Sequence, residues 1–461
     1  MSRVLTHYLR PRLPGTVHIF RLRSTSAKES HWVYVSLLAV IAFTLGSAAS
    51  AGITITLSAI AGVIFMGLMV RDAVSGSALA VTLVLFLGAV EPPRLAGVTV
   101  SNLGLAVCAA VLASKYLGTR TPGREVGFPI WTVLLVAVLL VSSSNLGALS
   151  ALSTPLLTAL TVFFIQQRSP SAVMVVLGAV GIFHAGIGLI ESLTHTSVIY
   201  TGWKDLTAAD VNGIRRAASL VGDPNYLGLT LLCCTPGIAF LSSTWRPPVK
   251  FIVWATYVAA FVLTFSRGAF LGAAVALCFY SVRKYPQLLR PKRLLAIALA
   301  AAFAIALASY SPVGQSLLGR FTGLDASTRS RSVLQSAALE LFQDHWLTGL
   351  GLGILSQHLA PLAQALVPLN ASGVSAFLPQ TDPLNTYLLI GAEGGILGLI
   401  LASAAILTAV FRSAKSAPLI AAVVLGIAIT AATLDLIQSP IVWCVMILAI
   451  NLPRNHRAAN I

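Results

Sequence analysis

The chain has 461 residues, of which 57% are hydrophobic and only 10% are charged. This composition excludes an ordinary soluble globular protein of this size. The net charge of +16 would suit a nucleic-acid-binding protein, but the distribution of basic residues described below indicates a membrane topology instead. We therefore expect no nucleic acid among its partners.

Apolar stretches of about 20 residues recur along the chain, and each is long enough to cross a hydrocarbon core of ~30 Å as a helix. They predict an all-α, polytopic membrane helix bundle with about 12–14 transmembrane helices and a large, partly helical extracytoplasmic loop. The apolar segments are 32–49, 52–70, 73–90, 98–117, 128–146, 148–166, 171–192, 219–243, 248–265, 267–282, 294–310, 384–411, 417–434 and 436–452.

The positive-inside rule tests this reading. With the N-terminus in the cytoplasm, 22 of the 30 lysines and arginines fall inside and eleven of the 14 acidic residues fall outside or near that face. The predicted parts are a basic cytoplasmic arm at 1–30 and a single multi-pass transmembrane domain at 31–461. Its large polar loops, 193–218 and 311–383, then lie outside.

Five cysteines all lie in apolar runs, and their spacing is not that of metal ligands or of a disulfide framework. We expect them to be small core residues and predict no metal site and no cofactor. They are Cys108, Cys233, Cys234, Cys278 and Cys444.

The loop 311–383 contains one predicted helix, which begins at Ser327 or Thr328 and runs to about Asp344. Its apolar residues recur at helical spacing, so the helix should lie on the membrane surface or pack over the bundle. The glycines of GLGLG, residues 349–353, end it. They do not form a dinucleotide site, because no strand precedes them.

Several arginines lie on the outer side, where basic residues are scarce. Arg267 stands between two apolar segments that are joined by almost no loop, and Arg215 and Arg216 precede a GDPN helix start. A guanidinium offers paired donors that match a phosphate. Together with Arg329 and Arg331, these residues predict an electropositive pocket for a membrane-bound diphosphate. The alternative is structural: Arg267 snorkels to lipid head groups, and Asp223 or Asn225 simply caps a helix.

Two acidic residues flank the point at which the chain re-enters the membrane. Glu393 lies about two turns into the segment that begins near Asn385, and Asp382 stands just outside it. A buried intramembrane acid should be protonated or paired, and it is a candidate functional residue. A structural pairing of Glu393 with an arginine is the alternative. Asp435 is expected to be only a cap or a surface charge.

Four separated patterns then resemble the O-antigen ligase and polymerase superfamily of bacterial membrane proteins. They are Arg216 followed by Pro224-Asn225, Ser266-Arg267-Gly268, STRSR followed by GLGLG, and PLNTYLLIGAEGGILGL. The resemblance covers about residues 210–400. It implies a metal-independent glycosyltransferase in the bacterial inner membrane, which transfers a glycan from undecaprenyl diphosphate to a lipid or glycan acceptor. Polysaccharide assembly proteins are possible partners.

The resemblance assigns the donor diphosphate to Arg216 and Arg267. We expect Arg329 or Arg331 to support them, and Arg215 and Asn225 to take part in substrate binding. Asp382, Asn385 and Glu393 are expected near the acceptor. One residue departs from the pattern: Leu384 stands where the family usually has a histidine that activates or orients the acceptor hydroxyl. Either another group such as Asp382, Glu393 or His358 substitutes, or the substrate differs, or transfer activity is lost.

Two alternatives stay open at this point. A transporter or flippase for a lipid-linked or anionic solute would use the same arginines without making a bond, but the chain shows no internal repeat typical of many transporters. A non-catalytic relative in a polysaccharide assembly complex would account for Leu384. Ligase and polymerase activity are not distinguished by these residues.

Overall fold

The computed structural model describes residues 170–195, 214–290, 326–351, 353–366 and 382–452, together with isolated positions elsewhere. The chain divides into two units, Met1–Ala61 and Gly62–Ile461, and all described residues belong to the second. The predicted arm at 1–30 and most of the predicted segments before residue 170 lie outside the described residues. The domain boundaries and the count of 12–14 helices therefore stay predictions.

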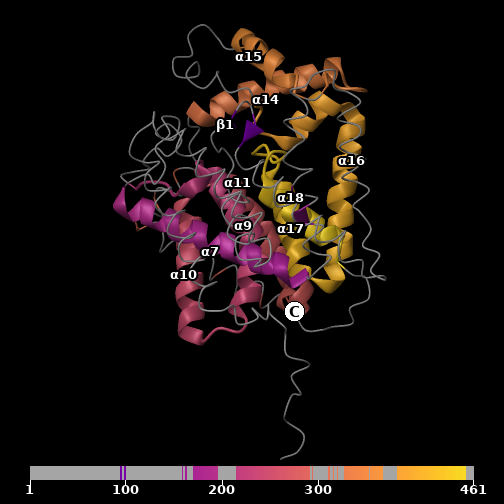
Figure 1. Ribbon diagram of the computed structural model, residues 1–461. Helices are drawn as coiled ribbons and strands as arrows, with labels where there is room; N and C mark the ends of the chain where they lie inside the picture. Colours follow the sequence, from indigo (N-terminus) through magenta and orange to yellow (C-terminus); the bar gives the residue numbers. More distant parts are fainter. Residues whose placement is uncertain are drawn as a thin grey trace, which may run out of the picture. The chain divides into compact units, whose positions relative to one another are not determined.

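The described part is helical apart from one short antiparallel strand pair, in which β1 (Arg94–Leu95) pairs with β2 (Val98–Thr99). Figure 1 shows the arrangement of its helices. They are α7 (Pro170–Thr194), η1 (Ser219–Val221), α9 (Pro224–Ser242), α10 (Pro247–Leu263), α11 (Arg267–Lys284), η2 (Pro286–Leu289), α14 (Ala326–Asp344), α15 (Leu355–Leu366), α16 (Thr386–Ser416), α17 (Pro418–Thr430) and α18 (Pro440–Ile450).

Within the described residues, three helices are long and apolar enough to cross a membrane: α7, α9 and α16. The apolar helices α10, α17 and α18 are shorter. These helices follow the predicted apolar segments to within a few residues at most ends, which supports a polytopic helical membrane protein. Their start points have local causes, since α9, α10, α17 and α18 each begin at a proline, whose fixed φ and missing N–H suit the first helical position.

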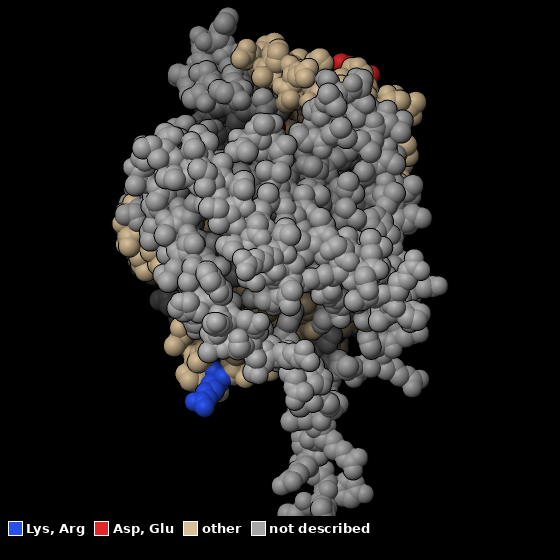
Figure 2. Space-filling model, in the orientation of Figure 1, with Lys and Arg blue, Asp and Glu red and all other residues tan. Residues whose placement is uncertain are grey.

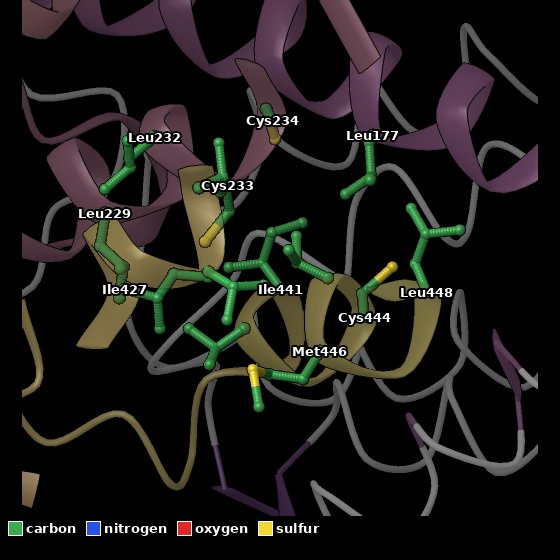
Figure 3. Packing of buried hydrophobic residues seen from close by; sticks show 14 of the residues in the cluster. Leu177, Leu229, Leu232, Cys233, Cys234, Ile427, Ile441, Cys444, Met446 and Leu448 are labelled. Carbon is green, nitrogen blue, oxygen red and sulfur yellow. The ribbon is translucent and has the colours of Figure 1, made fainter. Parts of the chain in front are cut away.

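The core lies between α7, α9, α17 and α18, where aliphatic side chains interdigitate (Figure 3). Cys233, Cys234 and Cys444 are buried in it as free thiols, as the sequence predicts. Cys278 is exposed, so the prediction of a core position was wrong for this residue, and Cys108 lies outside the described residues. Close helix approaches rely on glycine. A Cβ on Gly272 of α11 would lie 2.5 Å from the Gly426 carbonyl of α17. Small residues at such contacts let helix backbones pack tightly in membrane proteins.

The two ends of the bundle differ in charge. Among described residues, Arg246, Lys250, Arg283, Lys284, Arg412 and Lys415 lie at the end where α9, α11 and α16 finish. Described acidic residues lie at the opposite end, where these helices begin, and we call this the acidic end. On the face drawn in Figure 2, the acidic side chains in view lie beside α14 and the basic one lies at the far end.

α16 differs from the uninterrupted helix predicted over 384–411. Gly395 has φ 63° and ψ −164°, which breaks the helix into Thr386–Gly394 and Ile396–Ser416. This backbone conformation is essentially restricted to glycine. The sequence prediction missed the break because the segment is apolar over its whole length, which outweighed the low helix propensity of Gly394, Gly395 and Gly398.

The helix predicted from Ser327 or Thr328 to Asp344 is confirmed as α14. Its apolar residues Leu334, Ala337 and Ala338 are fully buried against α15 and Ala392 of α16. The second helix of the loop, α15, was not predicted. In Figure 1, α14 and α15 lie together at one end of α16.

Candidate active site

Arg216 is held at the acidic end by two acceptors. Its Nε donates to the Thr264 carbonyl at 2.9 Å, and its Nη2 donates to Asn225 Oδ1 at 3.1 Å. The side chain is only 5% exposed. These bonds bring together the segment that precedes η1, the start of α9 and the end of α10. Asp223 is the N-cap of α9 and accepts the backbone amides of Asn225 and Tyr226. The Asn225 side chain is therefore not needed as the cap, and its Oδ1 accepts Arg216 instead.

The Ser-Arg-Gly element follows directly. Ser266 caps α11 by accepting the Ala269 amide at 3.4 Å, so Arg267 occupies the first helical position. Phe265 before the cap is buried, with φ 49°. This uncommon backbone conformation for a non-glycine residue marks a sharp, strained turn. Half-buried Arg267 thus begins α11 shortly after Thr264, whose carbonyl accepts Arg216.

Gly268 brings the same element against the connection between α17 and α18. Thr430 Oγ1 donates to the Gly268 carbonyl at 3.3 Å, and a Cβ on Gly268 would meet Thr433 Oγ1 at 2.0 Å. Thr386, the first residue of α16, binds the same connection: its Oγ1 donates to the Leu434 carbonyl at 2.7 Å and accepts the Leu436 amide at 2.9 Å. The segment 431–439 therefore joins the Ser-Arg-Gly element to the start of α16.

Asp382, Asp435 and Arg331 form the titratable part of the site. Burial raises the pKa of Asp382 to about 6, opposed by the hydrogen bond from the Leu384 amide at 2.7 Å and by the charge of Arg331 on α14. Burial also raises the pKa of Asp435 well above its ordinary value, and the nearby Asp382 carboxylate adds to this. Asp435 is 7% exposed and accepts the Ile437 amide, so the expectation of a surface charge was wrong.

Leu384 and Asn385 prepare the start of α16. Leu384 has φ 51°, an unusual conformation for leucine. Asn385 Oδ1 accepts the amides of Tyr387 and Leu388 at 3.0 and 3.2 Å and so caps the helix. The described role of Asn385 is therefore helix capping. Leu384 thus connects Asp382, which accepts its amide, to the Asn385 cap through a strained backbone conformation.

Glu393 is buried, and its carboxylate is already engaged. Its Oε1 accepts the Gly353 amide at 2.9 Å, and the Leu355 amide binds the same carboxylate. Both donors lie at the beginning of α15, where free amides and the helix dipole favour an anion. The partner of Glu393 is thus backbone, and not the arginine that the sequence reading kept as an alternative.

Arg215 points to a different neighbour from Arg216. Its Nη1 donates to the His195 carbonyl at 3.0 Å, just after the end of α7, and its own carbonyl accepts from Ser192. The side chain of Arg329 lies outside the described residues, and no described interaction brings His358, the suggested substitute for the family histidine, into these contacts. The placement of Arg215 links α7 to the segment that carries Arg216.

Glu191 was missed by the sequence reading. It is 2% exposed, and its Oε2 accepts the amides of Ala218 at 3.3 Å and Ser219 at 2.5 Å. The Ser219 hydroxyl contacts His184 Nδ1 at 3.0 Å. These bonds fix the segment after Arg216. In the sequence, Glu191 is marked only by its place as an acid near the end of the apolar segment 171–192.

Arg216 and Arg267 therefore lie at the acidic end of the described helices, and the charge of Arg331 acts on buried Asp382, whose carboxylate acts on buried Asp435. Among described residues, no group of three or more histidine, cysteine or acidic side chains is arranged to hold a metal ion. The described part is thus that of a helical membrane protein with arginines and buried carboxylates at one end.

Residues 252–403, about a third of the chain, match the family model described as O-antigen ligase. The match includes Arg267, α14, α15 and the first half of α16, and it confirms the resemblance found in the sequence. This region is O-antigen ligase-like, and it supports a membrane role in polysaccharide biosynthesis. No curated protein matches the chain.

Proposed function

We propose that this protein transfers a glycan from a polyprenyl diphosphate, undecaprenyl diphosphate in bacteria, to a lipid or glycan acceptor at the outer face of the inner membrane. The observation that carries the proposal is the pairing of Arg216 with Thr264 and Asn225 directly beside Arg267. It supports a fixed two-arginine site within and next to an O-antigen ligase-like region.

The arginines would act on the leaving group. When the acceptor hydroxyl oxygen attacks the anomeric carbon, the bond from that carbon to the diphosphate oxygen breaks and negative charge grows on the diphosphate. Donors held in place before the reaction stabilise this charge without reorganising. Arg216 is held in place by its acceptors, so the positive charges of Arg216 and Arg267 suit this work, and we propose that Arg331, Arg215 and Arg329 add positive potential.

We propose that Asp382 is the general base that deprotonates the acceptor hydroxyl. Its pKa of about 6 is close to the value that suits a general base near neutral pH. It would take the hydroxyl proton as the new glycosidic bond forms, which is work that Leu384 in the histidine position does not do. Glu393 is less suited to this work, because its carboxylate already accepts backbone amides.

Asn225 and Asn385 have supporting roles in this scheme. Asn225 orients Arg216, and Asn385 caps the helix that follows Asp382. No metal or cofactor enters the proposed reaction. The lipid bilayer is the environment of both substrates, and polysaccharide assembly proteins are proposed as partners only because the O-antigen ligase-like region supports a role in that pathway.

The experiment is the surface-glycan ladder of a deletion strain that carries the intact gene, Arg267→Ala or Arg246→Ala. Arg246 is a matched control because it is exposed at the basic end. The proposal expects the intact gene and Arg246→Ala to restore long glycan, and Arg267→Ala to fail at equal membrane abundance. Full restoration by Arg267→Ala would instead favour transport or a scaffold role.

The deletion lane separates the two forms of the transferase. Glycan that accumulates on its lipid carrier indicates a ligase. Single repeat units attached to the acceptor indicate a polymerase.

A further inference from the structure

The connection between α14 and α15 forms hydrogen bonds with the backbone of α16 on both sides of its break at Gly395. The Ile396 amide, freed by the break, donates to the Trp346 carbonyl at 2.8 Å. The Leu350 and Gly351 amides donate to the Ala392 and Glu393 carbonyls at 2.8 and 3.0 Å. Unpaired backbone groups are costly in or near hydrocarbon, so this connection completes the hydrogen bonding of α16.

Glycine makes this contact sterically possible on both sides. Gly349 has φ 72°, and a Cβ there would lie 2.3 Å from the Glu393 carbonyl oxygen. Gly395 has φ 63°, and a Cβ there would lie 2.3 Å from the Leu347 carbonyl oxygen. The GLGLG and EGG sequences are therefore two halves of one backbone contact, which we call the α16 dock (residues 346–353 against 392–396).

Glu393 adds a side-chain bond to this dock. Its carboxylate accepts the amides of Gly353 and Leu355, so it holds the start of α15 while the backbone on both sides of it holds the connection. Directly beside it, fully buried Ala392 packs against α14 and α15. α14 carries Arg331, whose charge acts on Asp382. The dock thus fixes the helix that brings this arginine to the acidic carboxylates.

We propose that Glu393 is a positioning residue that holds the α14–α15 pair on the α16 dock and so keeps Arg331 beside Asp382. Its significance for catalysis rests on the proposed glycan transfer, but its role in the dock does not. Glu393, the acid of the Glu-x-Gly motif, then acts by accepting hydrogen bonds from the Gly353 and Leu355 amides. A glutamine, whose carbonyl oxygen also accepts an amide, should replace it in large part.

The first test is hydrogen–deuterium exchange on the full-length protein in nanodiscs. Exchange of amides in 349–355 reports opening of the dock. We expect Glu393→Ala to speed this exchange by about tenfold, and Glu393→Gln by less than about threefold, since an acceptor is kept. Glu340→Gln is the control, because Glu340 is an exposed acid on α14 outside the dock. Unchanged exchange in Glu393→Ala would overturn the proposal.

A second pair of variants opens the dock without touching Glu393. Gly349→Ala and Gly395→Ala place a methyl group against backbone carbonyls at positive φ, so both should speed exchange in 346–355. Gly319→Ala is the control, because a Cβ there meets nothing within 4 Å. Normal exchange in both dock variants would contradict the dock itself.

Glycan transfer gives the last readout. A positioning role predicts that Glu393→Gln keeps at least about a third of the transfer rate while Glu393→Ala loses most of it, in step with the exchange data. A general base predicts that both variants lose activity alike, and that Glu393→Gln does so with normal exchange, which would overturn the proposal. If the intact protein transfers no glycan, the proposed function fails, and the exchange results still decide whether Glu393 holds the dock.

Discussion

Arg216 and Thr264, which are 48 residues apart in the sequence, are joined by a 2.9 Å hydrogen bond from Nε to the backbone carbonyl. The bond ties the segment before η1 to the turn that precedes Arg267. A second bond from Nη2 to Asn225 fixes the plane of the guanidinium. Arg216 is therefore held in a fixed orientation before any ligand binds.

Arg216→Lys should lower kcat/KM for glycan transfer by at least about tenfold, because an ammonium is a point charge that does not reproduce the two directed bonds of the planar guanidinium. The measurement is the initial transfer rate of purified protein in nanodiscs with a lipid-linked donor. Arg246→Lys, at the exposed start of α10, should be unchanged. Equal rates for Arg216→Lys and the intact protein would show that charge alone suffices at this position.

Asp382 predicts opposite pH effects on activity and stability. As the proposed base, it works only when deprotonated, so the rate should fall as pH drops through about 6. Its pKa is raised from 3.8, so the folded state binds this proton more tightly than the unfolded state. The stability that this proton adds is present below the unfolded value and is lost as pH rises through about 6.

The measurement is a pH–rate profile beside a pH series of unfolding midpoints, for the intact protein and Asp382→Asn. Asn should abolish most transfer and remove this pH-dependent step in stability. Arg331, Asp435 and Glu393 also act on Asp382 or its neighbours, so Asp435→Asn is a necessary comparison. A rate profile that is flat from pH 5 to 7 would rule out a base with a pKa of about 6.

Much of this architecture could be predicted from the sequence, because hydrophobic periodicity and helix caps act over a few residues. α14, the Asp223 cap and the meeting of Arg216 with Asn225 were within reach for this reason. The break at Gly395, the helix α15 and the buried positions of Asp435 and Glu191 were not. They depend on backbone groups far away in the chain: Trp346 for the break, Ala218 and Ser219 for Glu191, and Thr386 for the segment around Asp435.

The contact between α11 and α17 can be tested through Gly272. An alanine there would place its Cβ 2.5 Å from the Gly426 carbonyl and 2.5 Å from Thr430 Oγ1. Because both neighbours are fixed in α17, we expect a destabilisation of about 1–3 kcal/mol from overpacking. The measurement is the thermal unfolding midpoint in one detergent. Gly186→Ala is the matched control, since a Cβ there meets nothing within 4 Å; equal midpoints for the two variants would contradict the close packing.

Thr386→Val tests the joint between α16 and the segment 431–439. The shape is kept and the Leu434 carbonyl still accepts the Thr386 amide at 3.1 Å, but it loses the hydroxyl donor and the buried Leu436 amide loses its acceptor. Leaving a buried amide unpaired costs about 1–3 kcal/mol, so the unfolding midpoint should fall. Transfer should fall as well, because Asp435 lies between these two anchoring residues and acts on Asp382.

Thr194→Val provides the control for that experiment, since the Thr194 hydroxyl is exposed and donates to the Ile190 carbonyl one turn earlier in its own helix. A surface change of this kind should stay within about 0.5 kcal/mol. If Thr386→Val were as mild as Thr194→Val, the two hydrogen bonds of Thr386 would not hold the segment. A Thr386→Val protein that unfolds earlier but transfers glycan normally would separate the joint from the reaction, and Asp435 would then have no part in setting the state of Asp382.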